Sequence, residues 1–289
     1  MKKMACIFFG LFFIFGVALA EKKRFVEFTS HRTPLDVSSV KIHDDVWKTI
    51  PPYRQPLQRQ FLEMPKPAKV GVKEVFVQSI HDGKHIAFRM VWPDATKNET
   101  PGITRFSDAA AIQFPVDREA FPEYFMGEAE KKVHILYWRA WRSKDRESGF
   151  QTTKSAYPNM TTDIYTFDYP IEGTGTQKTQ EEKDIFIPGK AANNPMSFPT
   201  KRIITELSSA GPGTISFKNI ENTSGDTAWE DGQWTVVIRR PLAVDDAQSV
   251  RFSPGERMPV AFAIWEGEQL EVGGRKAVSP AWAEVEVEK

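Results

Sequence analysis

The sequence holds few side chains whose type and spacing would support catalysis. His81 and His85 lie four residues apart, a spacing that can bind a metal ion on a helix. They flank an Asp-Gly turn, however, so we expect both to be solvent-exposed turn residues. His134 alternates with apolar neighbours in a strand-like run and is expected to be a packed or surface residue rather than a ligand. Hydrolase and nucleotide-binding motifs, such as G-x-S-x-G, H-E-x-x-H and the Walker A loop, do not occur.

One methionine differs in context from the others. Six methionines follow residue 20, and most of them should fill the core. Met126 instead lies in residues 121–127 (FPEYFMG), between two expected strands and beside a glycine and aromatic residues. A loop methionine of this kind could point its soft thioether into a pocket, and it could equally pack in the core. The residues themselves leave both interpretations open.

The first 20 residues have the features of a cleaved export signal. Lys2 and Lys3 precede an apolar run over residues 7–17, and Ala18-Leu19-Ala20 is a small-residue cleavage site. The run is short for a membrane anchor, and no other segment approaches a membrane span. We therefore expect a protein in the periplasm or an equivalent extracytoplasmic lumen. Cys6, the only cysteine, lies in this signal, so the mature chain would have no disulfide, no cysteine-bound iron–sulfur cluster and no covalent haem.

Period-2 alternation dominates the remaining sequence and predicts the elements that must position these residues. It indicates an all-β protein, mainly an antiparallel β-sandwich with a few short helices and long loops. Short helices are expected within residues 118–130 and 200–209, and at 181–184. We expect an N-terminal arm over residues 21–69 and a sandwich domain over residues 70–289 with a long loop insertion around 143–199. The expected strands cover residues 72–80, 85–92, 109–115, 133–141, 234–240, 259–265 and 282–288.

The composition excludes two broad classes of protein. The chain of 289 residues has 38 basic and 38 acidic side chains and 12% aromatic residues. A disordered chain would be poorer in aromatic residues and more strongly charged. A charge-balanced chain also has no electrostatic footprint for nucleic acid.

Seven stretches match a known family in their order along the chain. They are 91–94 (VWPD), 105–115 (RFSDAAAIQFP), 125–127 (FMG), 133–140 (VHILYWRA), 157–160 (YPNM), 260–267 (VAFAIWEG) and 273–282 (GGRKAVSPAW). Together they resemble the haem b-binding gamma subunits of the ethylbenzene dehydrogenase type, which accompany molybdenum enzymes of the dimethyl sulfoxide reductase superfamily. The long segment 143–199 and the arm before residue 69 are more similar to the nitrite oxidoreductase branch.

The resemblance implies a β-sandwich that holds one noncovalent b-type haem with methionine and lysine as axial ligands. The family's methionine corresponds to Met126, and its lysine, in a Gly-Gly-x-Lys stretch, corresponds to Lys276. Arg275 is adjacent, but a guanidinium stays protonated and is a poor ligand. Pro280 is a departure from the family pattern. Two filled axial positions imply an electron-transfer subunit rather than an enzyme, working between a molybdopterin and iron–sulfur oxidoreductase and a soluble c-type cytochrome.

Two alternatives stay open at this point. Similar sandwiches bind carbohydrate through exposed aromatic residues, and Trp138, Trp141, Trp229 and Trp234 could form such a platform. A related haem sandwich could instead use methionine and histidine, with His134 or His85 in place of the lysine. Arg139 and Arg105 are candidates for pairing with haem propionates, although both could equally be surface charges.

Overall fold

A computed structural model describes residues 27–62, 64–160, 187–218 and 222–289. The expected signal of residues 1–20 and the helix expected at 181–184 lie outside these residues, as does much of the expected loop insertion. The strands are β1 (Phe28–Arg32), β2 (Tyr53–Pro56), β3 (Gln58–Arg59), β4 (Glu74–His81), β5 (His85–Pro93), β6 (Ala109–Pro115), β7 (Val133–Arg139), β8 (Ile204–Ser209), β9 (Ser216–Phe217), β10 (Ser224–Glu230), β11 (Gln233–Pro241), β12 (Arg257–Trp265), β13 (Ala277–Val278) and β14 (Ala283–Val287).

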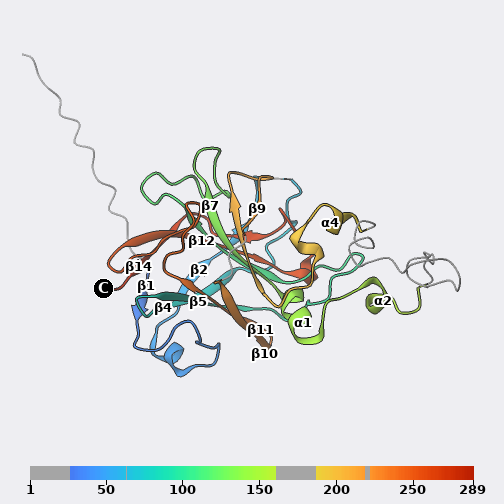
Figure 1. Cartoon of the computed structure of the whole chain (residues 1–289), viewed down its shortest axis with the longest axis horizontal. Coiled ribbons are helices and arrows are strands. Elements are labelled where there is room, and N and C mark those ends of the chain that lie inside the picture. The colour runs from blue at the N-terminus through green and yellow to red at the C-terminus, as the bar shows by residue number, and fades with distance from the viewer. Residues whose placement is uncertain (1–26, 63, 161–186, 219–221) are drawn as a thin grey trace, which may run out of the picture.

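These strands form two layers that are joined through β12. The first layer has the order β10-β11-β5-β4-β1-β14, and the second continues as β12-β6-β7-β8-β9. Residues 257–260 of β12 pair with β14, whereas residues 261–265 pair with β6. The chain therefore changes layer within one strand, as happens at the corners of sheet packings. In Figure 1 the helices α1 (Ala140–Ser148), α2 (Thr153–Ala156) and α4 (Pro188–Ala191) gather at the end of the molecule opposite the C-terminus.

Aromatic side chains fill the space between the layers. The ring of Trp138, on β7, meets those of Trp92 and Trp234 from the opposite layer at centroid distances of 5.8 and 4.9 Å, both edge to face. Phe88 and Phe114 meet across the same space at 5.5 Å. These contacts confirm the expected all-β sandwich, since two packed sheets bury alternate residues of each strand against one another.

The second layer is unusual because both of its faces are apolar. Alternate residues of β6, such as Ile112 and Phe114, belong to the core between the layers. The intervening residues Ala109 and Ala111 belong to a separate apolar cluster on the opposite face. All seven residues of β6 are buried. A strand of an ordinary two-layer sandwich would carry polar residues on that outer face.

One expected helix is a strand in the structure. Residues 204–209 form β8 and pair antiparallel with β7, with Leu136 opposite Glu206. The helix expected within residues 200–209 is therefore wrong, because pairing with β7 and burial of alternate side chains outweigh the local preference of a short segment. The helix expected between residues 118 and 130 is also absent, and bends and turns occupy this stretch, which contains Pro122 and Gly127. Conversely, the nine-residue helix α1 occupies the start of the segment expected as a loop from residue 143.

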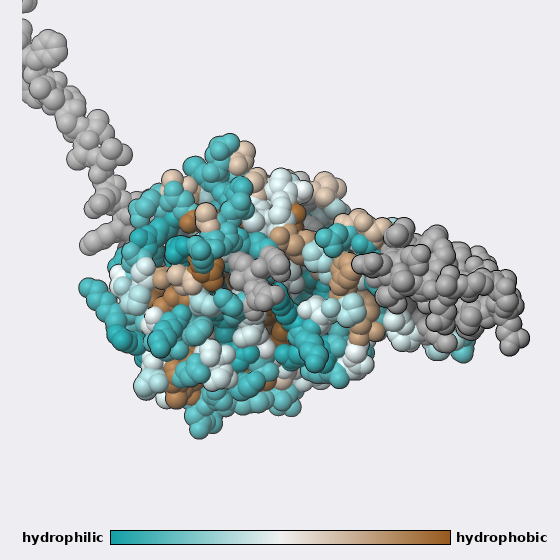
Figure 2. Space-filling model, in the orientation of Figure 1, coloured by the Kyte–Doolittle hydropathy of each residue, from teal (hydrophilic) through white to brown (hydrophobic). Residues whose placement is uncertain are grey.

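The N-terminal segment contributes strands to the sandwich. β1 lies between β4 and β14 and is parallel to both, and β2 and β3 pair with β4 and β13. The expected division at residue 69 stays a prediction. No helix in the described part of the chain is both long and apolar enough to cross a membrane. Hydrophilic side chains predominate on the face seen in Figure 2, with apolar patches scattered among them.

Candidate functional site

The outer face of the second layer carries the apolar cluster on which the site is built. Its members come from β6, β7, β8 and β12, with further side chains from two loops. The paired alanines Ala111 and Ala263 place short side chains in this face. The buried members are Ala109, Ala111, Val133, Ile135, Leu207 and Trp265, and Met126, Tyr137, Ala263 and Trp282 pack against them half-buried.

A tight turn holds Met126 against this face. Met126 and Gly127 have φ angles of 71° and 91°, in the region that favours glycine. The Met126 carbonyl accepts a hydrogen bond from the Gly211 amide at 3.0 Å. A Cβ at Gly127 would lie 2.7 Å from the Ser209 carbonyl oxygen, so only glycine fits this close approach to β8. The Phe-Met-Gly stretch therefore supplies a methionine side chain together with the glycine that allows its turn.

Lys276 reaches the same place from the segment that follows β12. Its carbonyl accepts a hydrogen bond from the Gln60 amide at 3.0 Å, immediately before β13 pairs with β3 and β12. Its Nζ lies 3.4 Å from the Met126 Sδ, to which it donates a hydrogen bond, and 5.0 Å from the centre of the Trp265 ring. Among the described residues no carboxylate forms an ion pair with this ammonium. Burial without a counter-charge lowers the pKa of Lys276 to about 8.

The structure thus brings together the two residues that the resemblance singles out. Arg275, the neighbour of Lys276, points elsewhere, with its guanidinium carbon 5.6 Å from the centre of the Phe106 ring. A thioether and an amine that is easily deprotonated are both donors to a transition-metal ion. The two donors touch, and they have to separate to admit an ion between them. Both side chains have the rotatable bonds for this movement.

Histidine does not take part in this site. His134 is completely buried on the inner face of β7, where its Nε2 lies 2.6 Å from Glu206 Oε2 and its Nδ1 accepts the Val250 amide at 3.2 Å. His134, expected to be either a packed or a surface residue, is packed in the core. The expected solvent exposure is wrong for His81, which is fully buried where β4 pairs with β1. His85 lies in the β4–β5 hairpin, away from the outer face of the second layer.

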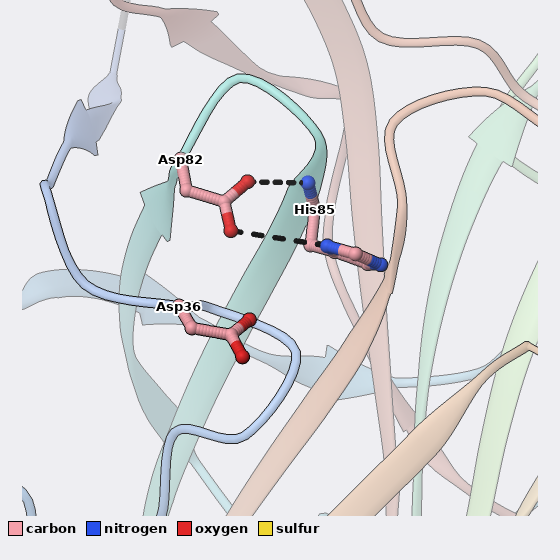
Figure 3. Close-up of side chains that lie close together, drawn as sticks. All are labelled: Asp36, Asp82 and His85. Atoms are coloured by element: carbon pink, nitrogen blue, oxygen red, sulfur yellow. Dashed lines mark hydrogen bonds and ion pairs between the residues drawn. The ribbon is translucent and has the colours of Figure 1, made fainter.

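His85 belongs to a half-exposed cluster of potential metal ligands, which local hydrogen bonding explains. Figure 3 shows Asp36, Asp82 and His85 close together. Asp82 accepts the backbone amides of Lys84 and His85 through Oδ1, and that of Val37 through Oδ2. Its carboxylate therefore closes the hairpin turn and ties it to the N-terminal segment.

Two further side chains are linked to the Met126–Lys276 contact through Trp265. The Tyr137 ring lies 5.2 Å from that of Trp265, and the guanidinium of Arg139 lies over the Tyr137 ring at 4.8 Å. Arg139 donates to Thr205 Oγ1 at 3.3 Å, whereas its Nε is buried with no partner among the described residues. Desolvation lowers the pKa of Arg139. Arg105, the other arginine considered above, is exposed in a turn with Gly102.

The expected aromatic platform for carbohydrate does not form. Trp138 and Trp234 are 0% and 2% exposed, because their large apolar rings lie between the layers. Trp141 and Trp229 are half-buried. The four tryptophans therefore do not make a common exposed surface. The carbohydrate platform that the sequence left open as an alternative is not present.

Comparison with known proteins gives the same family as the sequence motifs. The family model described as ethylbenzene dehydrogenase matches residues 44–277. A protein of Haloferax mediterranei named as respiratory nitrate reductase heme subunit ORF7 is 26% identical over 81% of this chain, and the match spans 64% of its own length. The chlorate reductase subunit gamma of Ideonella dechloratans is 24% identical over 82% of this chain and 75% of its own.

Among solved structures, one similar protein is a family 9 carbohydrate-binding module from Caldicellulosiruptor kristjanssonii in complex with glucose. It is 11% identical, covers 92% of this chain and 96% of its own, and has a TM-score of 0.39. A TM-score of this size does not establish a shared fold or a shared ligand.

Proposed function

Because the chain belongs to the ethylbenzene dehydrogenase family, we propose that it is a non-catalytic electron-transfer subunit that binds one b-type haem, with Met126 and Lys276 as axial ligands. The observation that carries the proposal is the 3.4 Å contact between Met126 Sδ and Lys276 Nζ on an apolar sheet face. These two residues come from distant parts of the chain, and no ordinary packing requirement would place a lysine ammonium against a thioether.

The surroundings of this contact suit a large planar apolar group with an anionic edge. The alanines of β6 and β12 and the flanking aromatic residues offer an apolar face of short and flat side chains. Arg139 lies near that face; its Nε is buried without a partner, and no carboxylate among the described residues pairs with its guanidinium. A propionate of the cofactor would be a suitable partner, since guanidinium and carboxylate form strong paired hydrogen bonds. The absence of cysteine after residue 20 means that the group would be held noncovalently.

The ligand residues determine what the site can do. The buried Lys276 amine loses its proton at a lower pH than an exposed lysine, so it can act as a neutral donor. The Met126 thioether is a soft donor, and methionine ligation raises the reduction potential of a haem. Met126 and Lys276 would hold the iron of the haem, which would supply one-electron chemistry. The protein residues fix its place and exclude water from its apolar side.

The partners and the location belong to the same proposal. The relatives are named as subunits of nitrate and chlorate reductases. We infer that this chain passes electrons between a molybdopterin catalytic subunit with its iron–sulfur subunit, of the nitrite oxidoreductase type, and a soluble c-type cytochrome. Residues 1–20 would direct it to the periplasm or an equivalent lumen, where such a cytochrome is available.

The direct test is an optical spectrum of the purified protein, oxidised and then reduced with dithionite, combined with pyridine haemochrome analysis. We expect a six-coordinate low-spin spectrum with one extractable b-type haem per chain. Rapid oxidation of the reduced protein by a c-type cytochrome, followed by stopped-flow absorbance, would support the electron-transfer role. A protein that stays colourless when it is produced and purified with excess haem would contradict the proposal.

A further inference from the structure

Three buried carboxyl groups meet at the end of the sandwich where β5 ends and β6 begins. Asp94 follows β5, Asp108 precedes β6, and Glu266 follows β12. Asp94 and Asp108 are 2% and 0% exposed, and Glu266 is 8% exposed. One carboxylate oxygen of each lies within 4.8 Å of the others. Acidic side chains are rarely buried unless something compensates their charge.

The protein supplies no cation to this cluster. Among the described residues, none of the three carboxylates forms an ion pair with a lysine, arginine or histidine. Desolvation raises the pKa of Asp94 to about 6. Desolvation, with repulsion from the neighbouring carboxylates, raises the pKa of Asp108 to about 7 and that of Glu266 to about 8. At neutral pH the cluster therefore keeps part of its protons, and a bound cation would take the place of those protons.

Hydrogen bonds hold Asp108 in position and leave an oxygen of Asp94 free. Asp108 accepts the Asn98 amide at 2.7 Å, the Trp234 indole N–H at 2.9 Å and the Gly267 amide at 2.9 Å. Asp94 Oδ1 accepts the Thr96 amide at 3.1 Å, whereas Asp94 Oδ2 is buried and makes no hydrogen bond of good geometry among the described residues. The Trp92 indole N–H also acts on the Asp94 carboxyl group and lowers its pKa, but its Nε1 likewise makes no hydrogen bond of good geometry. An anionic oxygen that is buried without a donor is costly, and its position beside two further carboxylates indicates a missing cation.

The loop after β5 adds neutral oxygens at alternate positions. Thr96 Oγ1 lies 3.0 Å from Asn98 Oδ1 and 3.5 Å from Glu266 Oε1. The donors near the cluster are therefore all oxygens, from carboxylates, a hydroxyl and an amide. Ca²⁺ prefers such oxygen sets, with several carboxylates and a flexible geometry, and nitrogen or sulfur ligands are absent from this group.

We propose that Asp94, Asp108 and Glu266 bind a divalent cation with the chemistry of Ca²⁺, independently of the haem. The cation connects the loop of residues 94–108 to the end of β12. Gly267 is pressed against that loop, because a Cβ there would lie 2.2 Å from the Phe106 carbonyl oxygen. The segment that starts at Gly267 leads to Lys276, so the cation also anchors the base of the lysine-bearing segment.

The test uses the full chain, stripped with EDTA and titrated with Tb³⁺ and then Ca²⁺. The Trp234 indole, 2.9 Å from the Asp108 carboxylate, is in position to sensitise terbium luminescence. We expect one Tb³⁺ per chain, displaced by Ca²⁺, and a rise in Tm on addition of Ca²⁺. Asp94→Asn keeps the acceptor for the Thr96 amide but removes a charged ligand. The affinity for Tb³⁺ and Ca²⁺ should then fall at least about tenfold, because the loss of a residue that only supports a metal ligand already costs that much.

Asp36→Asn is the matched control, because it removes one carboxylate from the half-exposed cluster of Figure 3. It should leave Tb³⁺ and Ca²⁺ binding unchanged. If Asp36→Asn abolishes binding and Asp94→Asn does not, the cation belongs to the other cluster and the proposal is wrong. A wild-type protein that neither binds Tb³⁺ nor gains Tm with Ca²⁺ overturns it as well. Glu266→Gln provides a second variant if Asp94→Asn does not fold.

Discussion

At the scale of single residues, the account depends on two donors that have little meaning separately. A loop methionine is ordinarily a packing residue, and a lysine is ordinarily an exposed cation. Their contact at 3.4 Å makes each of them informative, since Lys276 is half-buried and no carboxylate among the described residues pairs with its ammonium. The same logic applies to Arg139, whose buried Nε has no partner among the described residues.

The first prediction concerns Arg139. If its guanidinium pairs with a propionate, Arg139→Gln should weaken haem binding by roughly 10- to 100-fold, because a hydrogen bond to a charged group contributes about 1.5–3 kcal/mol. Arg105→Gln, on an exposed turn, is the control and should leave the affinity unchanged. Haem titration of the apoprotein, followed by absorbance, measures both. Equal affinities for wild type and Arg139→Gln would exclude the propionate role.

Residue patterns in the sequence predicted one candidate site and missed another. The positions Met126 and Lys276 came from short motifs of the family, and the structure places these motifs side by side. The carboxyl cluster was not predicted, although Asp94, Thr96 and Asn98 alternate as oxygen donors do in calcium-binding loops. Glu266 lies far away in the sequence, and only the pairing of β12 with β6 brings it to Asp108. The predicted solvent exposure of His81 was wrong because β1 pairs with β4 and covers this residue. The alternation of residues within β4 does not show that pairing.

At the scale of elements, strands were predicted better than the segments between them. Long alternating runs correspond to β4, β5, β6, β11 and β12, since burial of one face against a core leaves a period-2 trace. Residues 200–209 lack a regular alternation of apolar and polar residues because Glu206 occupies an inward-facing position, where it contacts His134. A buried contact between an imidazole and a carboxylate is a tertiary feature that periodicity cannot show.

The turn that carries Met126 gives a prediction at this scale. Gly127→Ala should destabilise the protein by roughly 2–5 kcal/mol, combining a left-handed conformation with overpacking against β8. Gly83→Ala is the matched control. Gly83 has a φ of 84°, close to the 91° of Gly127, but a Cβ there meets no atom within 4 Å, so only roughly 1–2 kcal/mol should be lost. Chemical denaturation measures both variants, and equal losses would contradict the close approach to β8.

At the scale of the whole molecule, the net charge of zero does not reveal that three acidic side chains are concentrated in one buried cluster. The chain has 38 basic and 38 acidic side chains. The face in Figure 2 is mainly hydrophilic, with apolar patches scattered over it. The carboxyl cluster inside the sandwich is therefore expected to influence the pH dependence of stability more than the surface does.

The corresponding prediction is made for protein in EDTA. In the unfolded chain Asp94, Asp108 and Glu266 release protons near their ordinary pKa values of 3.8 to 4.5, whereas in the folded chain they retain them up to about pH 6 to 8. Because these groups bind more protons in the folded state, their contribution to the free energy of unfolding is fully present below about pH 4 and is lost as the pH rises towards 8.

Thermal denaturation between pH 5 and pH 8 checks this slope. The wild type should lose Tm as the pH rises, and the Asp94→Asn/Glu266→Gln variant should lose less, since two of the three titrating groups are gone. Ca²⁺ should restore Tm most at the higher pH, where the carboxylates are ionised. A slope that is identical in wild type and variant would show that the cluster is not the titrating element.

The most direct test of the central claim is the reduced and oxidised absorption spectrum of the haem-loaded protein and of three variants. In Met126→Ala and Lys276→Ala, loss of one axial donor should convert a low-spin six-coordinate spectrum to a high-spin one or release the haem. Arg275→Ala, adjacent to Lys276 but directed at Phe106, should keep the wild-type spectrum. Low-spin spectra that are unchanged in both ligand variants would contradict axial ligation by Met126 and Lys276.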